Sequence, residues 1–180
     1  AIIAAMPESL RPQCAVSVKA PPEGEDWLHE LKYDGHRLLA FCSKDGVRLS
    51  TRNGKDWTDR FPPIANALKH LPTEKAILDG EAVVQRTDGT TDFQALQNVL
   101  KGTQNGRLLY RVFDLPYCGG WDLTHAPLLE RKHLLSVLLD NLPAGIDTIR
   151  ISDHVIGQGG TFYEHACAYS LEGIISKRAD

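Results

Sequence analysis

The sequence predicts an α+β fold in which helices pack on the outside of antiparallel β-sheets. Short strand patterns bounded by turn dipeptides recur along the chain. Helical patterns interrupt them, but without the regular strand–helix alternation that produces a parallel sheet. With 180 residues, of which 42% are hydrophobic, the chain is long enough to bury one sizeable core. We therefore expect a single domain that spans residues 1–180.

The first strong strand signals lie in residues 27–51, which have the pattern of three short strands. Asp-Gly pairs at 34–35 and 45–46 are hairpin signals, and an Asn-Gly pair at 53–54 ends the run. Strands joined by such short turns pair in antiparallel fashion. An antiparallel meander is therefore expected here.

Local signals define the remaining elements in chain order. Pro62 and Pro63 favour the start of a helix that Pro72 ends, and Asp92 is placed to cap the next helix. Apolar residues at helical spacing indicate an amphipathic helix at 127–139. The predicted helices are 62–70, 93–100, 127–139 and 161–169, and the further strands are 76–85, 107–115, 148–152 and 172–177.

Composition excludes some classes of function. No apolar stretch approaches the length of a membrane span, and no basic segment precedes the apolar N-terminal residues, so a cytoplasmic protein is expected. The net charge of −3 argues against a uniformly basic nucleic-acid-binding surface, but it leaves room for a local basic patch. The cations that could form this patch are Lys32, Arg37, Lys44, Arg48, Arg52 and Lys55.

The four cysteines are scattered, and no CxxC pair, HExxH motif or Cys/His cluster occurs. Such spacing indicates neither a disulfide framework nor a structural zinc site. We expect reduced thiols in the core at Cys14, Cys42, Cys118 and Cys167.

Lys32 is the candidate nucleophile. In its strand a period of two places Glu30 and Lys32 on one face, and Trp27, Leu31 and Tyr33 on the other. Taken alone, this pattern is typical of an exposed strand edge that ends in a hairpin. The interpretation as a nucleophile depends on the motifs that accompany it.

Five motifs follow one another along the chain: KYDGHR, STRNGKDWT, ILDGEAVV, YRVFDLPY and LEGIISKR. Together they resemble the nucleotidyltransferase motifs of ATP-dependent DNA ligases. TRNGKDWT, FQALQN and LEGIISKRAD are similar to the ligase module of bacterial end-joining ligase D proteins. The resemblance covers nearly the whole chain from Trp27 onward. It implies an ATP-grasp-like ligase nucleotidyltransferase fold, with antiparallel sheets that enclose a nucleotide pocket and helices that flank them.

The resemblance implies that Lys32 attacks the α-phosphate of ATP, which gives a lysyl-AMP and pyrophosphate. The AMP then passes to a DNA 5′-phosphate, and the 3′-hydroxyl seals the nick. A free lysine has a pKa near 10.4, so exposing its lone pair at pH 7 requires about 4.6 kcal/mol. Neighbouring cations, a bound metal and burial would all disfavour the ammonium form. The residues expected to act so are the cations Arg37, Arg52 and Lys177 and the aromatic residues Trp27 and Tyr33.

Further contacts are implied for the nucleotide. Glu81 would bind the ribose hydroxyls and lie near the metal, Phe113 would stack on adenine, and Arg52 would contact a phosphate. Each has a plainer interpretation, as an exposed strand glutamate, a core phenylalanine and a solvated turn arginine. The expected ATP or AMP contacts are Glu30, Leu31, Lys32, Arg37, Arg52, Glu81, Phe113 and Lys177.

The resemblance also implies a divalent cation, Mg²⁺ or Mn²⁺, held by Glu172 and Glu81. Strict alternation would place Glu172 and Lys177 on opposite faces of one strand, unless a bulge at Gly173 resets the pattern. The chain has no GxxxxGK[ST] loop, so side-chain cations and metal must hold the phosphates.

The implied substrate is nicked or broken double-stranded DNA in the bacterial cytoplasm, at the nucleoid. End-joining partners and fused polymerase or nuclease modules are implied for the full-length protein. The family pattern continues with a second lysine-rich motif and a C-terminal OB-fold domain, so the chain is expected to stop short of both. Two alternatives remain: an RNA ligase or mRNA-capping nucleotidyltransferase, and a non-catalytic nucleotide-binding module.

Overall fold

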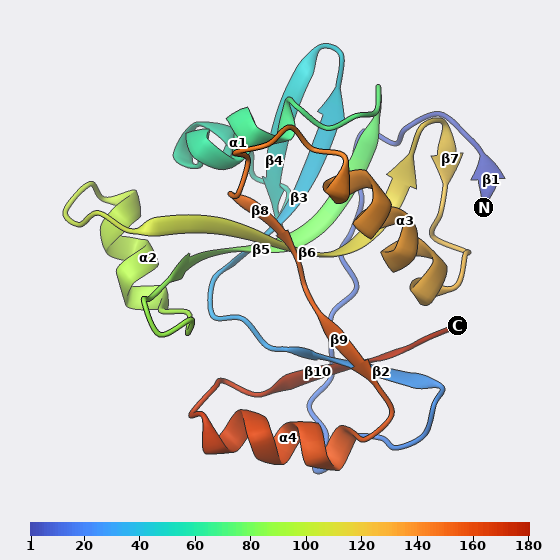
Figure 1. The fold of residues 1–180 in the computed structure, drawn as a ribbon. Helices are drawn as coiled ribbons and strands as arrows, with labels where there is room; N and C mark the ends of the chain where they lie inside the picture. The colour runs from blue at the N-terminus through green and yellow to red at the C-terminus, as the bar shows by residue number, and fades with distance from the viewer.

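The computed structural model describes all 180 residues as two β-sheets that face each other, with helices outside them (Figure 1). The small sheet has the strand order β10-β2-β9, and the large sheet has seven strands in the order β1-β7-β6-β5-β3-β4, with β8 paired to β6. All pairs are antiparallel except β6 with β8. The small-sheet strands are β2 (Trp27–Leu31), β9 (His154–Ile156) and β10 (Ile174–Arg178). The large-sheet strands are β1 (Ile2–Ile3), β3 (His36–Ser43), β4 (Gly46–Thr51), β5 (Ala76–Gln85), β6 (Arg107–Cys118), β7 (Trp121–Asp122) and β8 (Ile149–Ile151).

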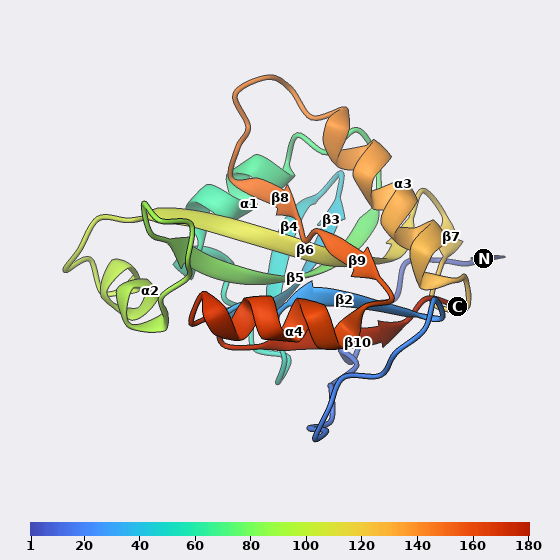
Figure 2. The same cartoon turned by 60° about the horizontal axis from the view of Figure 1, so that its bottom comes forward.

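The helices cover the outer faces of the two sheets. One hydrophobic core joins α1, α2 and α3 to the face of the large sheet that carries Leu38, Leu78 and Val112. On the other side of the molecule, α4 lies across the small sheet, as Figure 2 shows. The opposite faces of both sheets therefore turn toward each other. The helices are α1 (Pro62–Leu68), α2 (Phe93–Leu100), α3 (Leu128–Asp140), α4 (Gly159–Ala168) and a 3-10 turn, η1 (Thr58–Arg60).

Most of the locally predicted elements are confirmed. Strand β5 and helix α2 have the predicted bounds, and the Asp92 side chain caps α2 by accepting a hydrogen bond from the Ala95 amide at 2.9 Å. The hairpin at 45–46 is also confirmed, because Ser43 pairs with Gly46. All four cysteines are free, as predicted, but the predicted core position is wrong for Cys14 and Cys167, which are exposed; Cys42 alone is buried. No helix is long and apolar enough to cross a membrane.

The predicted meander at 27–51 is wrong at its first turn. Strand β2 pairs with β10 and β9, whereas β3 pairs with β4 and β5, so the chain crosses from one sheet to the other between them. Gly35 makes this crossing feasible. A Cβ at this position would lie 2.2 Å from the Ala82 carbonyl oxygen and 2.8 Å from a Val83 methyl. The Asp-Gly pair thus permits a close backbone approach rather than a hairpin.

Gly35→Ala should destabilise the fold by about 2 to 3 kcal/mol, because the added methyl overlaps main-chain atoms of β5. Gly89→Ala is the control, since its φ of +89° is left-handed but no atom lies within 4 Å of the new Cβ. The control should lose only about 1 kcal/mol from backbone strain. Urea unfolding of both variants measures the difference, and equal losses would show that the steric contact at Gly35 is unimportant.

Candidate active site

The candidate site lies between the two sheets, where Phe113 on β6 faces residues of β3 and β10. The Lys177 ammonium nitrogen is 4.2 Å from the Phe113 ring centroid, and the Arg37 guanidinium carbon is 5.1 Å from it. The neighbours Val112 and Leu115 belong to the helix-covered core, but Phe113 does not. Phe113 is partly buried and lies outside that core, so the plain core interpretation is wrong.

Arg37 is held rigidly by Asp79, a buried residue of β5 that sequence reasoning did not select. Two parallel hydrogen bonds, from Nε to Oδ1 at 3.0 Å and from Nη2 to Oδ2 at 2.7 Å, form a bidentate pair. The Gln13 carbonyl accepts a further bond from Nη1 at 2.6 Å. Burial raises the pKa of Asp79, and the hydrogen bond from Arg37 opposes this rise. The signal was present in the Asp of ILDGEAVV, two residues before Glu81.

Glu81 lies between two arginines on the inner face of the large sheet. It pairs in register with Arg37 on β3 and with Arg111 on β6, so the three side chains project from the same face. Burial raises the pKa of the Glu81 carboxyl to about 8, although Arg37 and Lys32 favour its ionised form. In the free protein this carboxyl is therefore largely protonated at neutral pH. Glu81 lies on the opposite face of β5 from Leu78, Ala82 and Val84, which belong to the hydrophobic core.

Lys32 lies at the end of β2 and forms an ion pair with Glu172. Its amide donates to the Gly173 carbonyl at 2.9 Å, which fixes the two segments side by side. The expected burial against Trp27 and Tyr33 is wrong, because the Lys32 side chain is 42% exposed. Trp27 lies five residues before Lys32, at the opposite end of β2, where it pairs with Arg178.

Glu172 and Lys177 both lie on the side of the small sheet that faces the candidate site, although strict alternation along one strand would place them on opposite faces. Strand β10 begins at Ile174, so Glu172 precedes it and is not bound by its alternation. Gly173 has a left-handed φ of +139°, which turns the chain between them. This resolves the conflict that strict alternation predicted.

Tyr33 and Leu31 do not share a face as predicted. The Tyr33 ring lies 5.6 Å from the Arg111 guanidinium carbon, toward the large sheet. Leu31 follows the alternation of His29, which lies against Gly159 of α4. The side chain of Leu31 therefore points toward α4, and only its backbone is available to a ligand between the sheets.

A buried ionic network beneath the site was not predicted. Glu30 and Lys132 are each 2% exposed, and the Lys132 ammonium donates to Glu30 Oε1 at 2.7 Å. Lys177 donates to Glu30 Oε2 at 2.9 Å. Burial lowers the pKa of Lys177, while Glu30 opposes this effect. Lys132 gave no sequence signal because it follows Glu130 and Arg131 directly in the chain, although in α3 it shares the buried face with Leu128 and Leu135.

The predicted basic patch is divided by the fold. Lys44 sits at the turn between β3 and β4 and pairs with Glu74, whereas Lys32 belongs to the other sheet. Arg52 is exposed. It directly follows Thr51, which pairs with Leu38, so Arg52 and Arg37 lie at the same end of the large sheet. Arg48 donates a hydrogen bond to the Glu8 carbonyl at 2.6 Å, and Lys55 is exposed in the same turn as Arg52. The six predicted cations therefore do not form one continuous patch.

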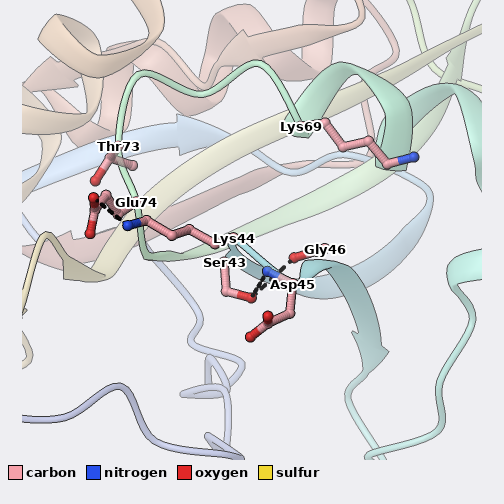
Figure 3. A pocket seen from close by; sticks show the side chains of 7 residues that line it. All are labelled: Ser43, Lys44, Asp45, Gly46, Lys69, Thr73 and Glu74. Carbon is pink, nitrogen blue, oxygen red and sulfur yellow. Dashed lines mark hydrogen bonds and ion pairs between the residues drawn. The ribbon is translucent and has the colours of Figure 1, made fainter.

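One surface hollow lies away from the candidate site. It has a volume of about 580 Å³ and lies at the β3–β4 turn, beside the loop that follows α1 (Figure 3). Lys69 and the pair of Lys44 with Glu74 line it, and its lining has no hydrophobic residue. A nucleotide base would find no apolar surface there.

The side chains do not form a preassembled metal centre. No group of three or more His, Cys, Asp or Glu side chains is close enough to hold an ion. Asp79 is already paired with Arg37, and the other carboxylates at the site that face Lys32 or Arg37 are Glu172 and Glu81. A divalent cation would need further oxygen ligands from a bound phosphate or water.

Known proteins are similar to this chain in sequence and in fold. Residues 12–180 match the sequence model of the family described as ATP dependent DNA ligase domain. The multifunctional non-homologous end joining protein LigD of Pseudomonas aeruginosa is 43% identical over 173 residues, 96% of this chain and 20% of that protein. The SPbeta prophage-derived DNA ligase-like protein LigB of Bacillus subtilis is 30% identical over 94% of this chain and 60% of its own length.

A solved structure, mycobacterial DNA ligase D complexed with ATP and MES, superposes with a TM-score of 0.80 at 28% identity. The match covers 95% of this chain and 55% of that one. The chain therefore spans only part of the proteins that it resembles. The predicted nucleotidyltransferase fold is confirmed.

Glu81→Gln should stabilise the protein at pH 8 but not near pH 4.5. The unfolded carboxyl ionises near 4.5 and the folded one near 8, so the wild type loses stability as pH rises through this range. At about 1.4 kcal/mol for each unit of pKa shift, the gain should reach a few kcal/mol. Thermal unfolding at both pH values measures it, with the exposed Glu130→Gln as control. A gain that does not depend on pH would contradict the assigned cause.

Proposed function

Because the chain belongs to the ATP-dependent DNA ligase domain family, we propose that it is the adenylation core of a DNA ligase with Lys32 as nucleophile. The observation that carries this proposal is the position of Lys32. Its ammonium lies at the mouth of the space between the sheets, paired with Glu172. Phe113 and the cations Arg37 and Lys177 occupy the interior of that space. An aromatic surface beside fixed cations suits a base joined to phosphates.

The first step transfers AMP to the enzyme. After Lys32 Nζ loses a proton to water, its lone pair attacks the α-phosphorus of ATP. A P–N bond forms as the bond from this phosphorus to the bridging oxygen breaks, and pyrophosphate leaves with the electron pair. The nitrogen then releases its second proton to water, which gives the neutral phosphoramidate. The exposed position of Lys32 gives water access to the departing proton.

Two further transfers seal the nick. An oxygen of the DNA 5′-phosphate attacks the same phosphorus, the P–N bond breaks and Lys32 regains a proton. The 3′-hydroxyl then attacks the activated 5′-phosphorus, loses its proton and displaces AMP, which leaves a phosphodiester bond. Positioning and charge neutralisation supply most of the rate in such transfers.

Side chains of both sheets support the proposed nucleotide contacts. Phe113 offers a ring for the adenine, Glu81 offers a carboxyl to the ribose hydroxyls, and Asp79 holds Arg37 in place beside them. The phosphates would extend toward Lys32 and the exposed Arg52. The backbone at Glu30 and Leu31 would border the base, because the Glu30 carboxylate is occupied by lysines.

We further propose that Mg²⁺ or Mn²⁺ binds with the nucleotide through Glu172 and Glu81. Two carboxylates suit Mg²⁺, which usually completes its coordination with substrate phosphates and water. When bound, the ion would neutralise charge on the phosphates. Lys32 would then be released from its pair with Glu172, which frees the amine for attack.

The proposed substrate is nicked or broken double-stranded DNA. LigD proteins of Pseudomonas aeruginosa and Mycobacterium tuberculosis are named for non-homologous end joining, and we extend this role to the present chain. End-joining partners and fused polymerase or nuclease modules are proposed on the same ground. The proposed place of action is the bacterial cytoplasm, at the nucleoid.

Lys32→Ala should abolish covalent labelling by ATP. Wild-type protein incubated with Mg²⁺ should retain label from the α-phosphate but none from the γ-phosphate, because pyrophosphate leaves. Intact mass and peptide mapping should place one AMP on Lys32. Lys69→Ala, which changes an exposed lysine far from the site, should label normally. Unchanged labelling of Lys32→Ala would show that another residue is the nucleophile.

Phe113→Ala should weaken AMP binding by about 1 to 3 kcal/mol, the range for loss of one aromatic stack on a base. Isothermal titration measures the affinity, and thermal unfolding measures stability in parallel. Phe93→Ala, at a ring that is 36% exposed, controls for general loss of an aromatic side chain. If Phe113 had only a packing role, stability would fall by about 3 to 5 kcal/mol and affinity would not change.

A further inference from the structure

Helix α3 places a lysine where a helix lysine is rarely found, in the interior next to the candidate site. Lys132 is 2% exposed, and its ammonium donates to Glu30 Oε1 at 2.7 Å and to the Ser152 carbonyl at 2.9 Å. A buried ammonium is costly unless it is paired and hydrogen-bonded. The proposed nucleotide contacts do not include Lys132, so its burial needs a separate explanation.

Glu30 connects Lys132 to the site. While Oε1 accepts from Lys132, Oε2 accepts from Lys177 at 2.9 Å and from the Ser152 hydroxyl at 3.1 Å. Two ammonium groups thus share one carboxylate. Each lysine limits how strongly the carboxylate can hold the other, because both draw on the same negative charge and repel each other.

Phe113 is where this network meets the proposed base site. Lys177 and Arg37 both lie against its ring, at 4.2 Å and 5.1 Å from the centroid. Arg37 is tied by two hydrogen bonds to Asp79 and by one to the Gln13 carbonyl. Lys177 has a single hydrogen bond, to Glu30. A base that stacks on Phe113 would therefore displace Lys177 rather than Arg37.

We propose that Lys132 is a positioning residue for nucleotide binding, because it holds the Glu30 carboxylate and so sets how firmly Lys177 is kept on the face of Phe113. The inference rests on the proposed function, in which the base stacks on that face. Lys132 shares Glu30 with Lys177 and thereby leaves Lys177 easy to displace. Once displaced, Lys177 is free to turn toward the phosphates.

Removal of the Lys132 charge should strengthen the hold on Lys177. Glu30 would keep Lys177 as its one ammonium partner, and the repulsion between the two lysines would vanish. The nucleotide would then have to break a stronger charge-assisted bond before the base could stack. Binding should weaken, whereas chemistry at saturating ATP should change little, because Lys32 and Glu172 are untouched.

The test compares Lys132→Met, Lys132→Arg and the exposed control Lys69→Met in the full chain. Initial rates of covalent labelling with α-labelled ATP, measured against ATP concentration, separate KM from kcat. Lys132→Met should raise KM about tenfold, equivalent to about 1.4 kcal/mol, and change kcat by less than about threefold. Lys132→Arg should restore KM, because its guanidinium can donate to both Glu30 and the Ser152 carbonyl. Lys69→Met should match the wild type.

A binding measurement without covalent labelling gives independent evidence. In protein labelled with ¹⁵N-lysine, the Lys177 ammonium signal should be shifted by the Phe113 ring current. Addition of AMP should remove this shift in wild type, and Lys132→Met should need about tenfold more AMP for the same change. Lys132→Arg should keep the Lys177 signal at its wild-type position.

The possible negative results distinguish an error in the proposed function from an error in the positioning role of Lys132. If wild type takes no label and AMP leaves the Lys177 signal unchanged, the proposed function itself is wrong. If wild type is labelled but folded Lys132→Met keeps the wild-type KM, the positioning role is overturned. Should Lys132→Met not fold, Lys132→Arg decides: a wild-type KM with an unmoved Lys177 signal supports the role, and a tenfold higher KM overturns it.

Discussion

The burial of the Glu30 carboxylate between the sheets is the interaction on which the rest of the structure depends. Its lysine partners come from α3 and β10, so one carboxylate joins a helix of the large sheet to two strands of the small sheet. Removing one member of a buried ion pair typically costs about 3 to 5 kcal/mol, since the remaining charge is left unpaired. The network therefore fixes how the small sheet sits over Phe113, and with it the width of the candidate site.

Charge pairing also explains how an acidic chain can offer a cationic site. Although the net charge is −3, several cations at the site have a placed acid: Arg37 pairs with Asp79, Lys32 pairs with Glu172, and Lys132 and Lys177 share Glu30. These pairs hold the cations at defined positions without requiring a basic surface. A phosphate or metal can exchange with one partner of a pair, so charge is redistributed locally rather than added. Net charge is thus a poor guide to phosphate binding in this protein.

Sequence patterns predicted elements well where local physics decides them. The Asp92 cap and the bounds of β5 and α2 depend on residues within a few positions of one another, and they were confirmed. The Asp-Gly pair at 34–35 was misjudged because the same dipeptide serves a tight hairpin and a close backbone approach. Only the position of β5, more than forty residues further along the chain, selects between the two.

The sequence by itself determined the α+β class, the family and the candidate set of Lys32, Arg37, Arg52, Glu81, Phe113, Glu172 and Lys177, because these lie in short motifs whose order is visible in one dimension. Only the tertiary structure decided which of these side chains meet. It alone placed Lys132 beneath Glu30, 102 positions away in sequence, and Glu172 against Lys32, 140 positions away. Such contacts carry no local signature, since they follow from the packing of two sheets and from the need to pair every charge that this packing buries.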